Sequence, residues 1–532
     1  MADGVMTGKR SQLPVLGTAS QSAGAAVARA KAAGRDTVSV GFVTLGCDKN
    51  TVDSERMLAR MLGAGASLSA DPADADVVVV NTCGFIESAK EESIEAILDA
   101  ARLKEGGRVR AVVATGCLVQ RYKDELAAEM PEVDLFLGLT DADKLVPELR
   151  RRGLLDERDV PTMERPLRVL TSRTPHTSYL KISEGCDHTC AFCAIPLMRG
   201  KFRSTPADVL IAEAQELERQ GVVELNIVSQ DTTWYGRDVA RGRVLEAGEY
   251  FVGDLGLRAS SAELRDNGAG AAAQPDRLRS SLPARSPKLE AALQPASLAA
   301  LVRRLLCETS VDWYRLFYMY PSGITRELVE LMATEPRLLP YLDMPIQHGS
   351  DRMLKAMRRP ERQATIRERV GWLRESIPDL SLRTTLIVGF PGETDDDFED
   401  MLALLEEVRF DRVGAFTYSL EENTRAAEMA DQVPDAVKRE RLERLLEVQA
   451  GISLERNERH VGRTMRMLID RIEADGTIVG RTQGQALEVD GVTVIPASSA
   501  SPSGSWKPEA GSFIQARIVD ALDDDLIAEL IA

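Results

Sequence analysis

The regular alternation of apolar segments with segments of helical periodicity is the feature that most constrains the fold of this chain. Three apolar runs end at Thr44, Asn81 and Thr115, and helical patterns such as 51–62 lie between them. Strands that alternate with helices favour a parallel sheet, because each helix carries the chain back to the start of the next strand. We therefore expect residues 36–153 to form a parallel α/β domain.

A second alternating block covers residues 172–446 and contains six candidate strands. Six strands separated by helix-length segments predict an incomplete (β/α)6 barrel, in which reactive groups lie at the carboxyl ends of the strands. Residues 237–295 interrupt the alternation with a stretch rich in Ala, Arg, Ser and Gly, which we interpret as a disordered insertion. The candidate strands are 179–182, 223–228, 313–319, 341–346, 382–389 and 413–418.

Both ends of the chain have a different pattern. Residues 449–532 consist of short β-prone runs divided by Gly and Asp turns, which predict a small antiparallel barrel of the oligonucleotide-binding type. Residues 1–35 are rich in Ala, Gly and Ser without periodicity, and we interpret them as a disordered tail. The candidate barrel strands are 464–470, 477–481, 486–489, 492–495 and 513–519.

The chain lacks the signals of an exported or membrane protein. No apolar run approaches the roughly 20 residues that span a bilayer, and the first residues have no apolar centre of a signal peptide. We therefore expect a cytoplasmic protein without a membrane partner. Its seven cysteines are better suited to metal binding or catalysis than to disulfides, because the cytoplasmic thiol pool keeps cysteines reduced.

Three cysteines directly after the first barrel strand give the sharpest chemical signal. Cys186, Cys190 and Cys193 have the spacing C-x3-C-x2-C, the signature of radical S-adenosylmethionine proteins. Three thiolates on a tight loop can hold three irons of a [4Fe–4S] cluster and leave the fourth open to S-adenosylmethionine. Zinc is the alternative, with His188 as a further ligand, but the paired C-x2-C halves typical of zinc sites are missing.

A second group of cysteines is dispersed along the N-terminal domain. Cys47, Cys83 and Cys117 each follow a predicted parallel strand and each adjoin a glycine. The carboxyl ends of parallel strands lie along one edge, so these thiols can converge on one site. The alternative is three buried structural cysteines. Cys307 lies on an apolar helix, and we expect it to be a core residue and not a ligand.

Together these motifs resemble the methylthiotransferase family, which combines a three-cysteine N-terminal domain, a radical S-adenosylmethionine core and a C-terminal TRAM barrel. The resemblance covers nearly everything from Thr37 onward except the insertion. It implies S-adenosyl-L-methionine and two [4Fe–4S] clusters as cofactors. One cluster delivers sulfur and the other cleaves S-adenosylmethionine. Carried over to this sequence, the respective ligands are Cys47, Cys83 and Cys117, and Cys186, Cys190 and Cys193.

Short strings distinguish two branches of the family: RimO enzymes, which modify an aspartate of ribosomal protein S-twelve, and MiaB enzymes, which modify a tRNA adenosine. This chain resembles the RimO branch. One departure is Asn423-Thr424-Arg425, where the family usually has Gly-Thr-Pro, so the shape of that loop does not follow from the resemblance. The RimO-like strings are Gly46-Cys47-Asp48-Lys49-Asn50, Val52-Asp53-Ser54-Glu55, 81–92, Gln230-Asp231-Thr232-Thr233, Gln347-His348 and Tyr418-Ser419 with Glu421-Glu422.

Charge supports the same branch independently. The chain has a formal net charge of −17, and residues 460–532 contain six Lys and Arg against eleven Asp and Glu. An acidic barrel is suited to a basic ribosomal protein better than to tRNA, because RNA binding requires cations against phosphates. Nucleic acid is therefore not expected as the main substrate.

The resemblance to the RimO branch implies a transferase that adds a methylthio group to the β-carbon of an aspartate of ribosomal protein S-twelve and that depends on external electron and sulfur donors. Gly389 and Gly392, after the fifth barrel strand, are candidates for backbone contact with S-adenosylmethionine, although a plain turn is equally compatible with them. The alternatives are a tRNA methylthiotransferase of the MiaB type, a non-catalytic iron–sulfur carrier and an RNA-binding module.

Overall fold

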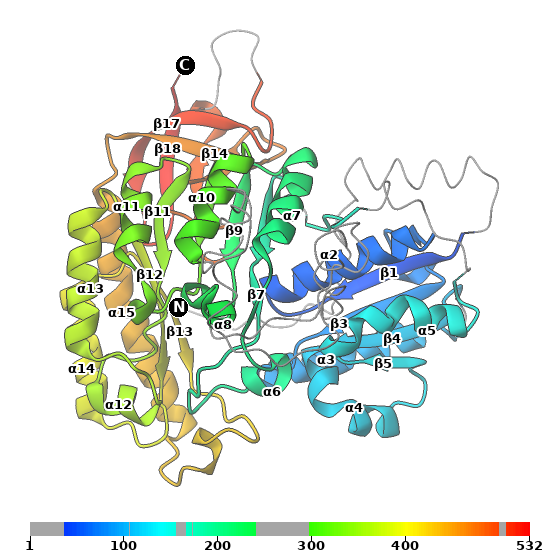
Figure 1. Ribbon diagram of the computed structural model, residues 1–532. Coiled ribbons are helices and arrows are strands. Elements are labelled where there is room, and N and C mark those ends of the chain that lie inside the picture. Colours follow the sequence, from blue (N-terminus) through cyan, green and yellow to red (C-terminus); the bar gives the residue numbers. More distant parts are fainter. Residues whose placement is uncertain are drawn as a thin grey trace, which may run out of the picture.

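The computed structural model describes residues 37–155, 166–240, 297–499 and 507–531, apart from residues 106 and 173. The tail 1–35 lies outside the described residues. So does the interruption 237–295, except for its first four residues, which form the short helix α8 (Arg237–Ala240). The described chain contains an N-terminal α/β sheet, a curved six-stranded sheet and a closed barrel (Figure 1). No helix in the described ranges is long and apolar enough to cross a membrane.

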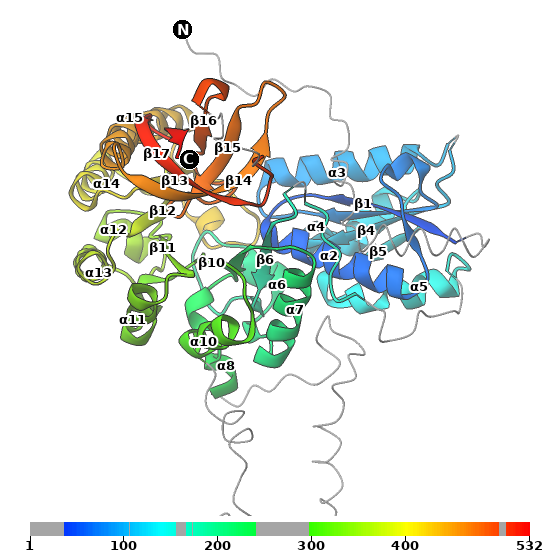
Figure 2. The same cartoon turned by 90° about the horizontal axis from the view of Figure 1, so that it is seen from above.

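The N-terminal domain is a five-stranded sheet whose strands all run parallel, in the order β2-β1-β3-β4-β5. Two apolar cores cover its faces, with α2 and α5 on one face and α3 and α4 on the other (Figure 2). This confirms the predicted parallel α/β fold. Its strands are β1 (Ser39–Thr44), β2 (Ser67–Leu68), β3 (Val77–Thr82), β4 (Ala111–Gly116) and β5 (Leu135–Leu137). Its helices are α2 (Asp48–Gly63), α3 (Glu87–Arg102), α4 (Cys117–Glu129) and α5 (Leu145–Arg151).

The central domain is a sheet of six parallel strands in chain order, β6-β9-β10-β11-β12-β13, which is not closed between its first and last strands. The incomplete barrel and all six of its predicted strands are therefore confirmed, with boundaries that differ by at most three residues. The strands are β6 (Thr177–Lys181), β9 (Glu224–Val228), β10 (Trp313–Leu316), β11 (Leu338–Asp343), β12 (Ser381–Val388) and β13 (Arg412–Thr417).

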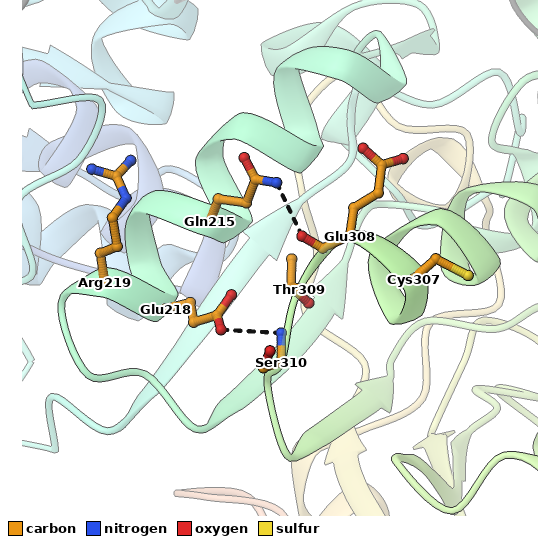
Figure 3. A pocket seen from close by; sticks show the side chains of 7 residues that line it. All are labelled: Gln215, Glu218, Arg219, Cys307, Glu308, Thr309 and Ser310. Atoms are coloured by element: carbon orange, nitrogen blue, oxygen red, sulfur yellow. Dashed lines mark hydrogen bonds between the residues drawn. The ribbon is translucent and has the colours of Figure 1, made fainter. Parts of the chain in front are cut away.

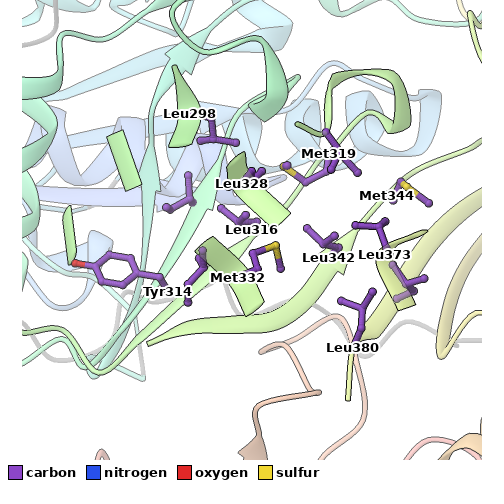
Figure 4. Close-up of a cluster of buried hydrophobic side chains, with 14 of the residues drawn as sticks. Leu298, Tyr314, Leu316, Met319, Leu328, Met332, Leu342, Met344, Leu373 and Leu380 are labelled. Carbon is purple, nitrogen blue, oxygen red and sulfur yellow. The ribbon is translucent and has the colours of Figure 1, made fainter. Parts of the chain in front are cut away.

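Helices cover the outer face of this sheet and bury the main apolar core against it. Leu316 and Leu342 from the strands pack there with Leu328 and Met332 from α11 (Figure 4). This core keeps the sheet curved with its opposite face turned inward. The larger helices are α7 (Ala207–Arg219), α10 (Leu298–Glu308), α11 (Arg326–Thr334), α13 (Gln363–Ser376), α14 (Asp395–Val408) and α15 (Asp435–Glu458), and the shorter ones are α6 (Ile195–Arg199) and α12 (Asp351–Ala356).

The C-terminal domain is a closed barrel in the order β14-β15-β16-β18-β17. Four of its five pairings are antiparallel, as predicted, but β16 and β18 pair in parallel. The strand expected at 486–489 is wrong: this segment is a turn, in which the Asp490 carboxylate accepts the Ala486 N–H at 2.9 Å. The strands are β14 (Thr464–Ile472), β15 (Ile478–Thr482), β16 (Thr493–Ile495), β17 (Phe513–Ala521) and β18 (Leu526–Leu530).

A buried ion network fastens this barrel to the end of the six-stranded sheet where the strands begin. Arg481 Nη1 lies 2.6 Å from Glu224 Oε2, and Arg481 Nε donates to Asp470 Oδ2 at 2.8 Å. Arg315 Nε donates to Glu224 Oε1 at 3.1 Å. Burial alone would raise the pKa of Glu224, but Arg481 and Arg315 lower it below its usual value of 4.5. The network therefore holds the C-terminal barrel at the amino ends of the strands, away from their carboxyl ends.

We expect Arg481→Ala to reduce the free energy of unfolding by about 3–5 kcal/mol, because it leaves Glu224 and Asp470 buried without their shared cation. The control Arg466→Ala removes an exposed pair with Asp312 and should cost no more than about 1 kcal/mol. Urea unfolding followed by circular dichroism measures both variants. Equal losses would contradict a structural role for the network.

Candidate active site

The C-x3-C-x2-C loop follows β6 at the carboxyl end of the six-stranded sheet. A two-stranded ribbon of β7 (Ser183–Glu184) and β8 (Arg203–Ser204) frames this loop. Cys186 N donates to Gly200 O at 3.0 Å, and Ala191 N donates to Met357 O at 2.9 Å, so backbone bonds fix the loop at two points. All seven cysteines of the chain are free thiols in the structure.

Polar groups from two other parts of the barrel approach the middle cysteine of this loop. Arg359 Nη1 lies 3.8 Å from Cys190 Sγ, and Tyr320 Oη lies 4.0 Å from the same sulfur. The Arg359 guanidinium also lies over the Tyr320 ring, 4.1 Å from its centroid. Neither residue belongs to a sequence motif, and their proximity to Cys190 depends on the curvature of the sheet, so sequence reasoning did not find them.

His188 has a structural role in the loop. Its Nε2 lies 2.7 Å from Asp231 Oδ2, and its ring stacks on Tyr320 with the centroids 4.2 Å apart. Asp231 is fully buried and also accepts the Thr233 N–H and hydroxyl. The string Gln230-Asp231-Thr232-Thr233 thus holds the cysteine loop through His188. Among the described residues, no group of three or more His, Cys, Asp and Glu side chains is placed to hold a single metal ion.

The other three cysteines follow three adjacent parallel strands, as predicted. Cys47 precedes α2, Cys83 follows β3, and Cys117 begins α4. Their thiols are close enough to affect one another: burial raises the pKa of Cys117 to about 12, and Cys47 and Cys83 contribute to the rise. The structure therefore brings the three thiols to one edge of the sheet.

The neighbouring glycines allow the three cysteine loops to approach one another. A Cβ on Gly46 would lie 2.8 Å from the Cys83 Cβ, and Gly46 has φ +90°. A Cβ on Gly84 would lie 2.8 Å from the Leu118 Cα, in the first turn of α4. Any other residue at these positions would force the loops apart.

The two cysteine groups share a wall. Cys117 packs in a small apolar cluster with Ala194 and Met198 of the α6 segment, and Ala194 is the residue that follows Cys193. The thiols of the two groups therefore lie on neighbouring loops of two different domains. Their separation of more than 65 residues in sequence gives no indication of this contact.

Asn50 and Arg199 form the polar part of the same wall. Asn50 Nδ2 donates to Leu45 O at 2.8 Å and to Thr82 O at 3.0 Å, and Asn50 Oδ1 lies 3.7 Å from Cys117 Sγ. Arg199 Nη2 donates to Asn50 Oδ1 at 2.7 Å. Arg199 is buried, and Glu184, Cys117 and Asp53 raise its pKa although burial alone would lower it. It places a fixed positive charge beside Cys47, Cys83 and Cys117.

A second contact closes the N-terminal domain onto the loop after β13. Glu421 is buried and lies 3.0 Å from Lys90 Nζ and 3.4 Å from Arg121 Nη1. Arg121 Nη2 also donates to Glu422 O at 2.6 Å. The acidic pair that favoured the RimO branch therefore connects the last barrel strand to the N-terminal domain.

This loop has Asn423-Thr424-Arg425 where the family usually has Gly-Thr-Pro, yet its backbone has a conformation that Gly-Thr-Pro could also adopt. Asn423 has φ +61°, a left-handed conformation that Asn tolerates better than other non-glycine residues. Arg425 has φ −64°, the value that a proline ring imposes. Thr424 Oγ1 donates to Glu421 O at 2.7 Å and completes the turn.

The turn with Gly389 and Gly392 follows β12, and hydrogen bonds to the Glu393 carboxylate hold it in place. Glu393 Oε2 accepts the Gly389 N–H at 2.8 Å, and Glu393 Oε1 accepts from Arg441 at 2.8 Å. A Cβ on Gly389 would lie 2.3 Å from Lys438 Cγ, whereas a Cβ on Gly392 would meet nothing within 4 Å. Packing therefore explains Gly389, and Gly392 leaves open space beside the turn.

The prediction that Cys307 is a core residue is wrong, because its side chain is exposed. The face of α10 that packs inward carries Leu298, Leu301 and Leu305, and Cys307 lies outside it. Cys307 borders a polar hollow beside α7, and Figure 3 shows it pointing away from Gln215 and Glu218.

The buried thiols fit a group that brings positive charge. Burial raises the pKa of Cys186 and of Cys193 to about 12, and Cys190 adds to both shifts. Such thiols remain protonated at neutral pH unless a cation stabilises the thiolates, and iron does so when it coordinates them. The chemistry of the loop therefore suits an iron–sulfur cluster.

Three family profiles match the chain. Uncharacterized protein family UPF0004 matches residues 39–138, the radical SAM superfamily matches 288–405, and the TRAM domain matches 461–531. The fold and these matches define a radical S-adenosylmethionine enzyme with a C-terminal TRAM domain. Membership in this superfamily implies a [4Fe–4S] cluster and S-adenosylmethionine.

Relatives with high similarity over nearly the whole chain refine this class. The ribosomal protein uS12 methylthiotransferase RimO of Anaeromyxobacter sp. (strain K) is 44% identical over 92% of this chain and 92% of its own length. That of Geobacter sulfurreducens is 40% identical over 93% of this chain and 98% of its own length. The chain belongs to the RimO family.

We expect Cys307→Ser to leave the iron content of the anaerobically reconstituted protein unchanged, because Cys307 lies on the outer surface of α10. Colorimetric iron determination measures this, with Cys190→Ser as the positive control for ligand loss. A fall by the equivalent of one cluster in Cys307→Ser would contradict the prediction.

Proposed function

We propose that this chain transfers a methylthio group to the β-carbon of an aspartate of ribosomal protein uS12, the substrate that the names of its relatives give for those proteins. The observation that carries the proposal is the contact of Cys117 with Ala194, next to Cys193, which puts the two cysteine groups on one wall. Transfer of a sulfur group to an unactivated carbon requires a radical source and a sulfur source near the same substrate atom. Two adjoining cysteine groups meet this requirement.

The ligand assignment is part of this proposal. Cys186, Cys190 and Cys193 hold the [4Fe–4S] cluster that binds S-adenosylmethionine, and Cys47, Cys83 and Cys117 hold a second one. Each group offers three thiols on loops at strand ends, which leaves one iron of each cluster without a protein ligand. Support for the second site comes from the close approach of its three loops at Gly46 and Gly84.

When bound, the clusters and S-adenosylmethionine supply the one-electron chemistry that activates a saturated C–H bond, which no side-chain base deprotonates at neutral pH. The residues of the chain adjust this chemistry. Arg359 and Tyr320 direct polar hydrogens toward Cys190 Sγ, and donors to a ligating sulfur raise the reduction potential of a cluster. Arg199 contributes differently, because it adds a positive charge beside Cys117 without donating a hydrogen bond to its sulfur.

The turn after β12 is the part of the site that we assign to S-adenosylmethionine. Gly392 has φ +80° and open space where a side chain would lie, so a ligand can approach its backbone closely. Its N–H donates to Asp431 O at 2.6 Å and its carbonyl accepts from Arg352 at 2.7 Å, so the approach is by van der Waals contact. Glu393 and Arg441 keep the turn rigid from beneath. We assign the same contact to Gly389, although its missing side chain already makes room for Lys438.

The substrate is a basic protein, and the TRAM barrel supports this choice. Its excess of acidic residues attracts a basic ribosomal protein. Electrons and sulfur come from external donors. An enzyme that modifies tRNA would be expected to have a basic barrel. A protein that only carries a cluster would not need the second cysteine group or the barrel.

We predict about eight irons per chain after anaerobic reconstitution, because each cysteine group accepts one four-iron cluster. The variant with Cys186, Cys190 and Cys193 replaced by Ala should retain about half. Iron and sulfide determination with Mössbauer spectroscopy measures this. An iron content of about four per unmodified chain would contradict the proposal of a second cluster.

We predict that ribosomes from a strain lacking this gene contain uS12 without the mass of one methylthio group, and that the full chain restores it. Mass spectrometry of ribosomal proteins and of digested tRNA from the same cells makes the comparison. Loss of a methylthio group from tRNA, with uS12 unchanged, would establish the MiaB-type reaction instead.

A further inference from the structure

A hollow of about 260 Å³ lies where the TRAM barrel meets the start of β12 and β13. The end of α13, the C-terminal end of α15 and the β15 edge of the barrel form its other walls. The cysteine loops lie at the opposite ends of these strands, so the hollow is separate from the proposed active site. Neither the family resemblance nor the cluster chemistry gives it a role.

The hollow is positively charged in a chain whose net charge is −17. Five arginines and two aspartates line it. Arg456 Nε pairs with Asp411 Oδ1 at 2.5 Å, and Arg463 Nη2 pairs with Asp379 Oδ2 at 2.6 Å. Arg374, Arg412 and Arg459 form no ion pair with a carboxylate of the described residues. Arg374 and Arg412 donate to backbone carbonyls, those of Val408 and Arg409 and those of Asp411 and Asp524, which leave their positive charge without a counterion.

Four side chains of the hollow also have a buried nitrogen without a hydrogen-bond partner in the described part of the chain. They are Arg374 Nε, Arg412 Nε, His460 Nδ1 and Gln485 Nε2. Arg412 is only 7% exposed and Gln485 only 1%. Native proteins satisfy nearly all such buried groups, and these four unpartnered nitrogens belong to side chains that line one hollow.

The environment of the titratable groups is consistent with an uncompensated positive potential. Burial lowers the pKa of His460, and Arg463 lowers it further, against the opposing effects of Asp411 and Asp379. Burial and Arg456 likewise lower the pKa of Arg374. Asp524 interacts with Arg412 from outside and does not line the hollow.

We propose that this hollow is a binding site for a phosphate group. Guanidinium and amide N–H groups arranged around a small hollow match a tetrahedral oxyanion, and charged hydrogen bonds from arginine are the strong ones. The phosphate is either a free anion or a phosphodiester of RNA beside the protein substrate. The site does not depend on the cysteines and does not require the proposed reaction to be correct.

Isothermal titration of the full chain with sodium phosphate, at constant ionic strength, tests the proposal. Arg459 is exposed and Arg463 makes an exposed pair, so Arg459→Gln with Arg463→Gln should leave the fold intact. The matched control is Arg471→Gln with Arg517→Gln, which removes two exposed arginines elsewhere on the TRAM barrel, paired with Glu473 and Glu529. We expect at least about tenfold weaker phosphate binding in the first pair and less than about twofold change in the control.

A second arm identifies the source of the phosphate. Fluorescence anisotropy with a short labelled single-stranded RNA, with phosphate as competitor, is measured on the same variants. RNA binding that phosphate displaces and that only the first pair weakens assigns the site to a phosphodiester. Phosphate binding without RNA binding assigns it to a free anion. Binding of neither ligand by the unmodified chain, or equal losses in both variant pairs, would overturn the proposal.

Discussion

The arrangement of the catalytic parts depends on polar side chains buried at the start of α2. Asp53 pairs with Lys181 and Arg199, and Glu55 pairs with Arg168, which also contacts Glu213. A buried ion requires a partner, since desolvation costs several kcal/mol per charge. These charges are therefore satisfied only when the N-terminal domain docks on β6 and α7 in one orientation, and that orientation sets the two cysteine groups side by side.

Two further contacts make this docking rigid. Lys49 lies over the Tyr318 ring, 3.1 Å from its centroid, at the end of β10, and Glu421 holds Lys90 and Arg121 after β13. The N-terminal domain therefore contacts the carboxyl end of the open six-stranded sheet across its width, from β6 to the loop after β13. At the other end of the strands the TRAM barrel is held by Arg481 and Glu224. The three domains leave the carboxyl ends of the strands as the place for chemistry.

The local sequence was sufficient for most elements. All six strands of the central sheet follow from apolar runs and spacing, because a parallel strand covered by helices is apolar along much of its length. The segment 486–489 has the apolar pattern of a strand but forms a turn, because Ala486 packs at a domain junction and donates its N–H to the Asp490 carboxylate, while Val489 is exposed. Cys307 was assigned to the core because composition alone does not fix which side of a helix packs inward.

The sequence by itself determined the class of chemistry, since the spacing of Cys186, Cys190 and Cys193 requires no distant contact to form one loop. It also placed Cys47, Cys83 and Cys117 at three strand ends. Only the tertiary structure decided that the two groups adjoin and that a hollow lined by five arginines lies under the TRAM barrel. The reason is physical: these features depend on pairs such as Arg168 with Glu55 and Arg199 with Asn50, which are 113 and 149 residues apart. Sequence periodicity reports only on neighbours within a few turns or strands, and carries no information about such partners.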